Sequence, residues 1–204
     1  FIVFSVYTHN LQKKIAHALF QNSAILIYML ELSAKLVNQA VLSLRTGGQV
    51  ATATEPIINP DNLKIEGFYC DDRFDKKQLI LLSQDIRDRA RKGFVINDHE
   101  VLVEPEDLIR LKGVLELQFT LIGKPVITTN KKRLGKVNDY AVDDVALYVQ
   151  KLYVTQSLVK SLTGGSLSID RSQIVEITDR KIVVQDPMKP VKNAVPAGAP
   201  SVAA

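Results

Sequence analysis

Few side chains in this 204-residue chain have types and spacings that could do chemistry. The three histidines are His9, His17 and His99. His99 is followed by Glu100, but no second histidine follows at the spacing of a zinc protease. His9 and His17 lie in residues 1–28, whose status is doubtful, so the single cysteine, Cys70, and the one histidine of the core, His99, are too few ligands for a structural zinc site. We therefore expect no catalytic centre, no metal and no cofactor, which means a protein that is not an enzyme.

Two other reactive-looking patterns lack the neighbours that reactivity needs. Cys70 precedes Asp71 and Asp72, whose negative charges disfavour a thiolate, so we expect a small buried strand residue. The dipeptide Gly123-Lys124 is followed by Pro125 and lacks the preceding glycine of a phosphate-binding loop. A lone cysteine cannot form an intrachain disulfide, which fits a cytoplasmic protein.

Charged residues gather in several short segments. Arg87-Asp88-Arg89 alternates in sign, which is typical of an exposed face with salt bridges. The acidic groups have no EF-hand spacing and are expected to be solvated loops: Asp98, Glu100, Glu104, Glu106 and Asp107, and separately Asp71, Asp72 and Asp75. The candidate contacts with a protein partner or with RNA phosphates lie in predicted turns: Lys131, Lys132, Arg133, Asp143, Asp144, Arg180 and Lys181.

The net charge of +4 is located at the ends of the chain. Residues 1–28 and 187–204 contain four lysines and no acid, so residues 29–186 are neutral. A nucleic-acid-binding domain usually has a concentrated basic footprint, which this core lacks. Within it, residues 29–117 carry 12 basic and 15 acidic residues, and residues 118–186 carry 10 and 7. This asymmetry indicates that the halves attract each other, or that the second presents a basic face to a partner.

The elements that position these residues are predicted to be strands. Short apolar runs separated by turn signals indicate an all-β architecture. Between Leu63 and Cys70 the alternation places Ile65, Gly67 and Tyr69 on one face and Phe68 and Cys70 on the other. Ser83 is expected to cap a helical turn over 83–92. Residues 134–154 are expected to form a hairpin of two strands around an acidic turn, and further strands are expected near 41–44, 50–54, 63–70, 79–82, 94–96, 101–103, 126–129, 167–169, 173–178 and 181–184.

The most informative feature is an internal repeat. Val50 to Cys70 aligns without gaps on Leu134 to Val154, at an offset of 84 residues. Upstream, residues 36–41 match 121–126, and downstream residues 83–86 resemble 171–174. Identities are few, and the match depends on the shared order of strands and turns. Because such a small sheet exposes its edges unless it closes, the repeat predicts two small β-barrels in tandem.

The second copy resembles the PRC-barrel family. The resemblance is carried by Leu134-Gly135-Lys136-Val137, by the acidic turn at Asp143-Asp144 and by the segment Ile169 to Ile177. In the first copy Ala51 stands where the family has glycine, and Asn59-Pro60 replaces the acidic turn. The family includes the photosynthetic reaction centre H subunit and the C-terminal domain of a bacterial ribosome-maturation factor. The resemblance implies binding and assembly modules without a shared catalytic centre.

The expected organisation is two small PRC-type β-barrels in tandem, at 29–117 and 118–186. A short non-barrel segment precedes them, and a disordered Pro/Ala-rich tail, 187–204, follows. Residues 1–28 are expected to be sequence upstream of a start at Met29. The competing interpretation of 1–28 is a surface helix or membrane-touching segment, and only this interpretation would make a membrane a partner.

The expected function is a non-enzymatic, cytoplasmic binding or assembly adaptor with an unidentified protein partner. The loops 130–133 and 179–181 would carry its contacts, and contacts between barrels or between copies of the chain are also expected. The alternative is an RNA- or ribosome-associated factor that acts in small-subunit maturation. The neutral core and a first copy that resembles another PRC-barrel favour the adaptor.

Overall fold

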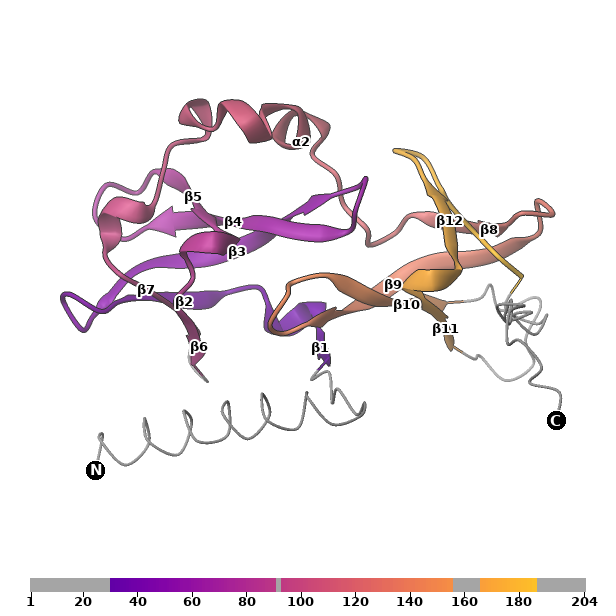
Figure 1. The fold of residues 1–204 in the computed structure, drawn as a ribbon, viewed down its shortest axis with the longest axis horizontal. Coiled ribbons are helices and arrows are strands. Elements are labelled where there is room, and N and C mark those ends of the chain that lie inside the picture. Colours follow the sequence, from indigo (N-terminus) through magenta and orange to yellow (C-terminus); the bar gives the residue numbers. More distant parts are fainter. Residues whose placement is uncertain (1–29, 91–92, 156–165, 187–204) are drawn as a thin grey trace, which may run out of the picture. The chain divides into compact units, whose positions relative to one another are not determined.

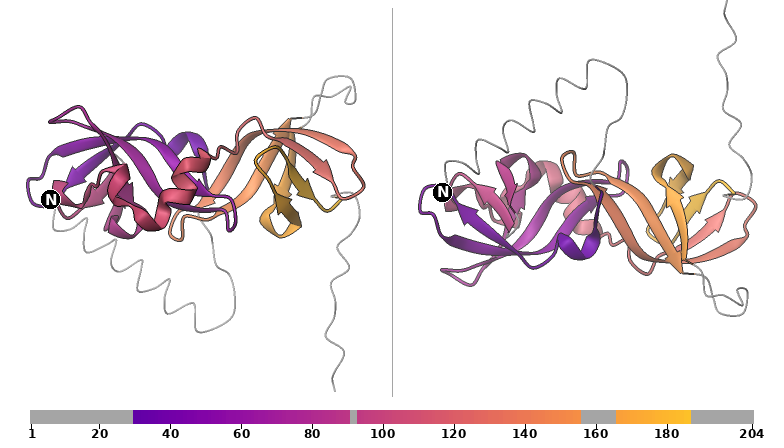
Figure 2. Two further views of the ribbon diagram at one scale, coloured as in Figure 1. Left: turned by 90° about the horizontal axis from the view of Figure 1, so that it is seen from above. Right: turned by 90° about the horizontal axis from the view of Figure 1, so that it is seen from below.

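The computed structural model describes residues 30–90, 93–155 and 166–186 (Figure 1). The predictions for the leader 1–28 and the tail 187–204 lie outside these residues, as do Arg91 and Lys92. The described residues from Glu31 onward belong to the second of the two units into which the chain divides. The second unit contains two β-sheets, whose strands are drawn from indigo to magenta and from orange to yellow in Figures 1 and 2.

The first sheet has the strand order β5-β4-β3-β2-β7-β6. Strands β2 and β7 are parallel, and the other neighbours are antiparallel. A short 3-10 helix, η2 (Ser83–Asp85), joins β5 to β6. The strands are β2 (Gln39–Ser43), β3 (Gln49–Asn59), β4 (Lys64–Asp72), β5 (Gln78–Leu82), β6 (Asp88–Ala90) and β7 (Gly93–Ile96).

The second sheet repeats this arrangement in the order β11-β10-β9-β8-β13-β12. Its parallel pair is β8 with β13, and the 3-10 helix η6 (Arg171–Gln173) joins β11 to β12. A seventh strand, β1 (Leu30–Leu32), pairs with β9. The identical topology confirms the internal repeat. The strands are β8 (Pro125–Thr128), β9 (Arg133–Asp143), β10 (Val149–Thr155), β11 (Ser166–Asp170), β12 (Ile174–Ile177) and β13 (Ile182–Val184).

The repeat extends to the irregular positions of the backbone. Strands β3 and β9 have the same length, and each residue of β9 lies 84 positions after its equivalent in β3. Two non-helical positions with positive φ, Gly47 and Leu63, recur at Lys131 and Leu147 with the same offset. β-Bulges recur in the same way, at Val50, Thr54 and Glu66 in the first sheet and at Leu134, Asn138 and Gln150 in the second. The alignment is therefore correct residue by residue.

The bulges explain one wrong prediction. Phe68 and Cys70 were expected on the face opposite Ile65, but all three are fully buried. Glu66 is the extra residue of a bulge, because Ile57 pairs with Gly67 while Ile58 pairs with Ile65. An extra residue reverses the alternation of a strand, so strict period-2 counting fails across it.

Three other predictions need correction. The helical turn expected within 83–92 is present as η2, but Ser83 is its first residue and not its cap: the Ser83 hydroxyl donates to the Ile65 carbonyl at 2.7 Å, and β6 follows. The strand expected at 101–103 is absent: Val101 ends a 3-10 helix (His99–Val101), Leu102 is irregular, and Val103 makes an isolated bridge. Neither strand order closes on itself among the described strands, so the class is all-β with two open sheets, and two closed barrels are not confirmed.

The segment between the sheets is helical in short pieces. The 3-10 helices η3 (His99–Val101), η4 (Pro105–Asp107) and η5 (Ile109–Leu111) lead into α2 (Lys112–Leu117). Helix α2 lies over β3 (Figures 1 and 2). A further 3-10 helix, η1 (Ser33–Lys35), contacts β9. The segment in front of each sheet's first strand, β2 or β8, therefore packs against the long strand of the other sheet.

The two sheets are joined by a pairing between equivalent hairpins. The Ile65 N–H donates to the Leu147 carbonyl at 2.8 Å, and the Val149 N–H donates to the Leu63 carbonyl at 2.9 Å. These bonds flank an antiparallel bridge between Lys64 and Tyr148. Each bond becomes the other when the repeats are exchanged, so the junction has a local two-fold relation of the kind found in symmetric dimers.

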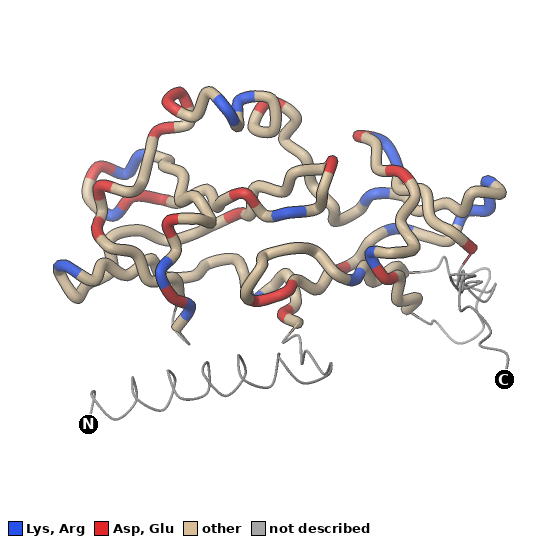
Figure 3. Tube along the Cα trace, viewed as in Figure 1, with Lys and Arg blue, Asp and Glu red and all other residues tan. Residues whose placement is uncertain are grey.

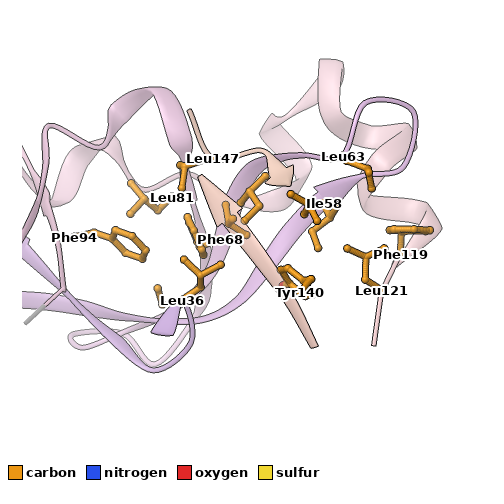
Figure 4. Close-up of a cluster of buried hydrophobic side chains, with 14 of the residues drawn as sticks. Leu36, Ile58, Leu63, Phe68, Leu81, Phe94, Phe119, Leu121, Tyr140 and Leu147 are labelled. Carbon is orange, nitrogen blue, oxygen red and sulfur yellow. The ribbon is translucent and has the colours of Figure 1, made fainter. Parts of the chain in front are cut away.

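One hydrophobic core runs through this junction. Buried side chains of both sheets form a single cluster. Figure 4 draws Leu147, from the second sheet's hairpin, among Phe68 and Leu81 of the first sheet, and Leu63 towards Phe119. Leu63 and Leu147 are 3% and 5% exposed. The tips of both hairpins therefore contribute apolar side chains to the shared core.

Candidate interaction surfaces

The turn between β8 and β9 carries the basic tip, defined as Lys131, Lys132 and Arg133. All three residues are exposed. Thr128, which is 1% exposed, holds the turn: its carbonyl accepts from the Lys131 N–H at 2.9 Å and its hydroxyl from the Lys132 N–H at 3.2 Å. Lys131 has a φ of 62°, the left-handed conformation of a tight turn. A buried threonine thus fixes the backbone that presents three cations.

Arg180 and Lys181 lie in a different turn, between β12 and β13, and are also exposed. The Lys124 ammonium donates to the Asp179 carbonyl at 2.6 Å, which ties this turn to the start of β8. Because the basic tip follows the other end of β8, the two groups are separated by the length of that strand, about 13 Å. Figure 3 shows them as separate blue segments of the second sheet. The structure does not bring them together.

Asp143 and Asp144 lie at the junction between the sheets. Asp143 is 4% exposed, and its carboxylate accepts the N–H groups of Val145 and Ala146 at 2.9 and 2.8 Å. The carboxylate therefore builds the turn of the hairpin. Asp144 is half-buried, and its carbonyl accepts from the Arg89 guanidinium at 3.2 Å.

Arg89 is the charged residue that links this turn to the first sheet. Its guanidinium also pairs with the Glu31 carboxylate and lies over the Phe94 ring, 5.4 Å from the centroid. Burial raises the pKa of Asp144, the charges of Asp143 and Glu31 raise it further, and Arg89 opposes them. Salt bridges such as Lys64–Glu66 and Lys151–Asp170 join residues of the same half. The contacts between the sheets include backbone hydrogen bonds and apolar packing. Salt screens interactions between exposed charges and does not screen these contacts.

A cavity of about 370 Å³ lies between α2 and the first sheet. Its lining residues include the acidic Glu55 and the phenolic Tyr69. Burial raises the pKa of Tyr69, and the neighbouring Glu55 charge adds to the effect. Since no lysine or arginine lines it, the cavity does not suit an anion. The complete lining is Glu55, Pro56, Ile57, Ile58, Tyr69, Gln78, Val114, Gln118, Phe119 and Thr120.

A histidine–aspartate pair is the contact that the sequence did not indicate. His99 Nε2 lies 2.7 Å from a carboxylate oxygen of Asp72, which is 5% exposed. The His99 and Phe74 rings pack nearly perpendicular to each other, at 5.2 Å between centroids. His99 and Asp72 are 27 positions apart, so no local sequence motif indicates that they form a pair. The hydroxyl of Ser43 is bonded to Asp98, so it does not complete a catalytic triad with this pair.

The described residues add no further chemical site. Within the ranges 30–90, 93–155 and 166–186 no three histidine, cysteine or acidic side chains converge as metal ligands would. Over the same ranges, no helix has both the length and the apolar character to cross a bilayer. Comparison with models of known protein families gives no match, and comparison with curated proteins finds none that is similar.

Proposed function

We propose that the protein is a non-enzymatic cytoplasmic adaptor built from two PRC-barrel-type modules. The observation that carries the proposal is the basic tip, in which buried Thr128 holds three exposed cations on one rigid hairpin. Turns fixed on a sheet scaffold are common recognition sites. The equivalent turn of the first sheet, around Gly47, has no such cluster, so the two modules present different chemistry at equivalent positions.

The partner of the basic tip is expected to be an acidic protein surface. A cluster of three cations suits a small anionic patch, and electrostatic complementarity of this kind guides association and orientation. RNA is the second candidate, because exposed lysines and arginines also neutralise phosphates. The adaptor is favoured because Arg180 and Lys181 lie at the far end of β8, so the two basic turns do not form one continuous track.

The test is affinity capture from native cell extract with and without ribonuclease. The tip variant carries Lys131→Ser and Lys132→Ser. The matched control carries Arg180→Ser and Lys181→Ser, which removes the same charge from the other turn. We expect one nuclease-resistant partner that the wild type and the control retain and that the tip variant loses at least tenfold. Equal capture by all three proteins would refute the assignment to the basic tip.

Capture that depends on intact RNA would favour the second candidate. That outcome is checked by titrating a single-stranded RNA oligonucleotide at several salt concentrations. Each phosphate contact with a single strand contributes about 0.7 to the magnitude of the slope of log K against log salt. If both lysines contact phosphates, the tip variant should therefore reduce that magnitude by about 1.4. The adaptor hypothesis does not require this change in the salt dependence of RNA binding.

A further inference from the structure

The cavity between α2 and the first sheet has the size and the lining of a small-molecule site. Its volume of about 370 Å³ lies near the lower end of the range for ligand pockets, about 300 to 1,000 Å³. Glu55 and Gln118 of its lining are exposed, whereas Ile57, Ile58 and Phe119 are buried. Figure 4 draws Ile58 and Phe119 within the shared core. A ligand here would meet polar residues near solvent and apolar residues towards the core.

The equivalent place in the second sheet is occupied by a hydrogen bond. Glu55 pairs with Tyr69 in one ladder and Asp139 pairs with Tyr153 in the other, so Asp139 stands at the position of Glu55. The hydroxyl of Ser33, in η1, donates to the Asp139 carboxylate at 2.6 Å. Helix η1 lies on β9 as α2 lies on β3. In the second sheet, therefore, the chain supplies the partner of this carboxylate itself.

The first sheet lacks the counterpart of that bond. The match of 36–41 with 121–126 places Gln118 at the position of Ser33. Gln118 follows α2 in a left-handed conformation, with a φ of 42°, and lines the cavity together with Glu55. Among the residues that the structure describes, none forms a hydrogen bond or an ion pair with the Glu55 carboxylate. The two repeats differ at this point, and the Glu55 carboxylate is available to a ligand.

The charge of the cavity favours a cation. Burial raises the pKa of Tyr69, and the Glu55 charge raises it further. The pKa of Tyr140 is also raised, by burial first and then by the charges of Asp139 and Glu55. Both phenols are therefore neutral at pH 7. Among the described residues that line the cavity, Glu55 alone is charged.

Lys124, which follows the cavity segment in the chain, is engaged elsewhere. Its ammonium donates to the Asp179 carbonyl at 2.6 Å and lies over the Phe119 ring, 4.4 Å from the centroid. Burial lowers the pKa of Lys124, and the charge that opposes this effect is that of Asp179. Lys124 therefore covers one face of Phe119 and does not serve as the counter-ion of Glu55.

A metal ion suits this cavity less well than an organic cation. Ca²⁺ takes about six to eight oxygen ligands. In the part of the chain that the structure describes, no three histidine, cysteine or acidic side chains converge as metal ligands would. A single carboxylate beside apolar side chains matches a ligand with one charged end and one hydrocarbon end.

We propose that the cavity binds a small organic cation, an alkylated ammonium or guanidinium compound. Its charged group pairs with Glu55, and its hydrocarbon part packs between Val114 of α2 and Ile57 of β3. The side-chain amide of Gln118 is placed to bond to the charged end. A carboxylate on the ligand would be repelled by Glu55. This proposal does not depend on the adaptor function.

The test is a titration of the full chain with butylguanidinium, followed by residue-resolved amide NMR shifts. Butanol and butyrate are the control probes, because they carry the same hydrocarbon chain on a neutral and on an anionic group. We expect butylguanidinium to shift the amides of Glu55, Ile57 and Gln118 with saturation. Butanol and butyrate should bind at least tenfold more weakly.

Two variants and a matched control assign the binding to the cavity. Glu55→Gln removes the charge and keeps the size of the side chain, whereas Glu176→Gln removes the same charge from an exposed residue of β12. We expect Glu55→Gln to weaken butylguanidinium binding at least tenfold, about the effect of one charge-assisted hydrogen bond, and Glu176→Gln to leave it unchanged. Val114→Phe narrows the cavity and keeps the charge, so it should also weaken binding. The amide spectra of the variants check that each is folded.

Three results would overturn the proposal. The first is equal binding of butylguanidinium by the wild type and by Glu55→Gln. The second is binding of butanol as tight as that of butylguanidinium, because the site would then recognise hydrocarbon alone. The third is a set of shifts that grow linearly with concentration and scatter over the acidic surface residues, because this would be non-specific attraction of a cation.

Discussion

The shared core at the junction predicts that Leu147→Ala destabilises both sheets together. Leu147 belongs to the second sheet's hairpin, yet it is drawn among Phe68 and Leu81 of the first sheet (Figure 4). Its carbonyl also accepts the Ile65 N–H. The variant removes the apolar end of the side chain and keeps the backbone bond.

The magnitude follows from burial. Leu147 is 5% exposed, so nearly all of its side chain leaves water on folding. Burial contributes about 0.8 kcal/mol for each methylene removed, and the residual cavity adds to this, which gives a cost of about 3 to 4 kcal/mol. Its φ of 56° does not change the estimate, because leucine and alanine both carry a Cβ. Leu63→Ala, at the equivalent position, is expected to cost a similar amount.

The assay is urea unfolding followed by far-UV circular dichroism and by amide exchange in the core strands of each sheet. Val145→Ala is the control, since Val145 lies in the same hairpin and is 88% exposed. It is expected to change the free energy of unfolding by less than about 0.5 kcal/mol. The transitions of both sheets should coincide in the wild type and should move together in Leu147→Ala.

Either of two results would refute this reasoning. A cost below about 1 kcal/mol for Leu147→Ala would mean that the side chain does not fill a closed core. Separate transitions for the two sheets, with only the second affected, would mean that the core is not continuous through the junction.

Three further predictions concern single positions. A Cβ at Gly93, whose φ is +147°, would overlap the Ala40 backbone, whereas Gly113 in α2 faces open space. Gly93→Ala should therefore lower the free energy of unfolding by more than about 2 kcal/mol, and Gly113→Ala should raise it by about 0.5 to 1 kcal/mol. Thermal unfolding of both variants tests this, and the opposite order of stability would contradict it. Burial opposes ionisation of Asp72, but bonds from the Asp75 N–H and His99 outweigh it and lower its pKa. This contribution is present at neutral pH and is lost as pH falls below about 4, so unfolding measured between pH 2 and 7 should show a shallower acid loss for Asp72→Asn; parallel profiles would exclude the effect. Burial raises the pKa of Cys70 to about 12, with the Asp71 charge adding to it; at pH 8 a thiol reagent should therefore react slowly until urea unfolds the chain, and rapid native reaction would disprove it.

The repeat could be predicted from the sequence because turns and apolar runs recur at a constant offset. The ungapped match of 50–70 on 134–154 predicted equivalent strands, and β3 and β9 have equivalent bounds. Cys70 was also placed correctly, as a buried strand residue. These features are local in sequence, so periodicity and turn residues were sufficient to identify them.

The features that were missed depend on tertiary contacts. The bulge at Glu66 follows from pairing with β3, so it reverses the faces of β4 without any local signal. The pairing of His99 with Asp72 joins distant segments. Asp143 has the composition of an exposed acidic turn, but the hairpin it builds packs against the first sheet, where its carboxylate is enclosed. Sequence patterns identify turns and do not show which of them another sheet will cover.

The local two-fold relation limits where the two modules can differ in function. A module that pairs with its own copy uses the same surface twice, so both hairpin tips are committed to the junction. The turns at Gly47 and Lys131 are equivalent to each other and remain exposed. Near the first of these turns, Arg45 is already paired with Asp98, whereas Lys131 and its neighbours form a basic cluster. Because these positions share a backbone and differ in charge, we expect partner selectivity to change when the two turn sequences are exchanged, while the free energy of unfolding changes little.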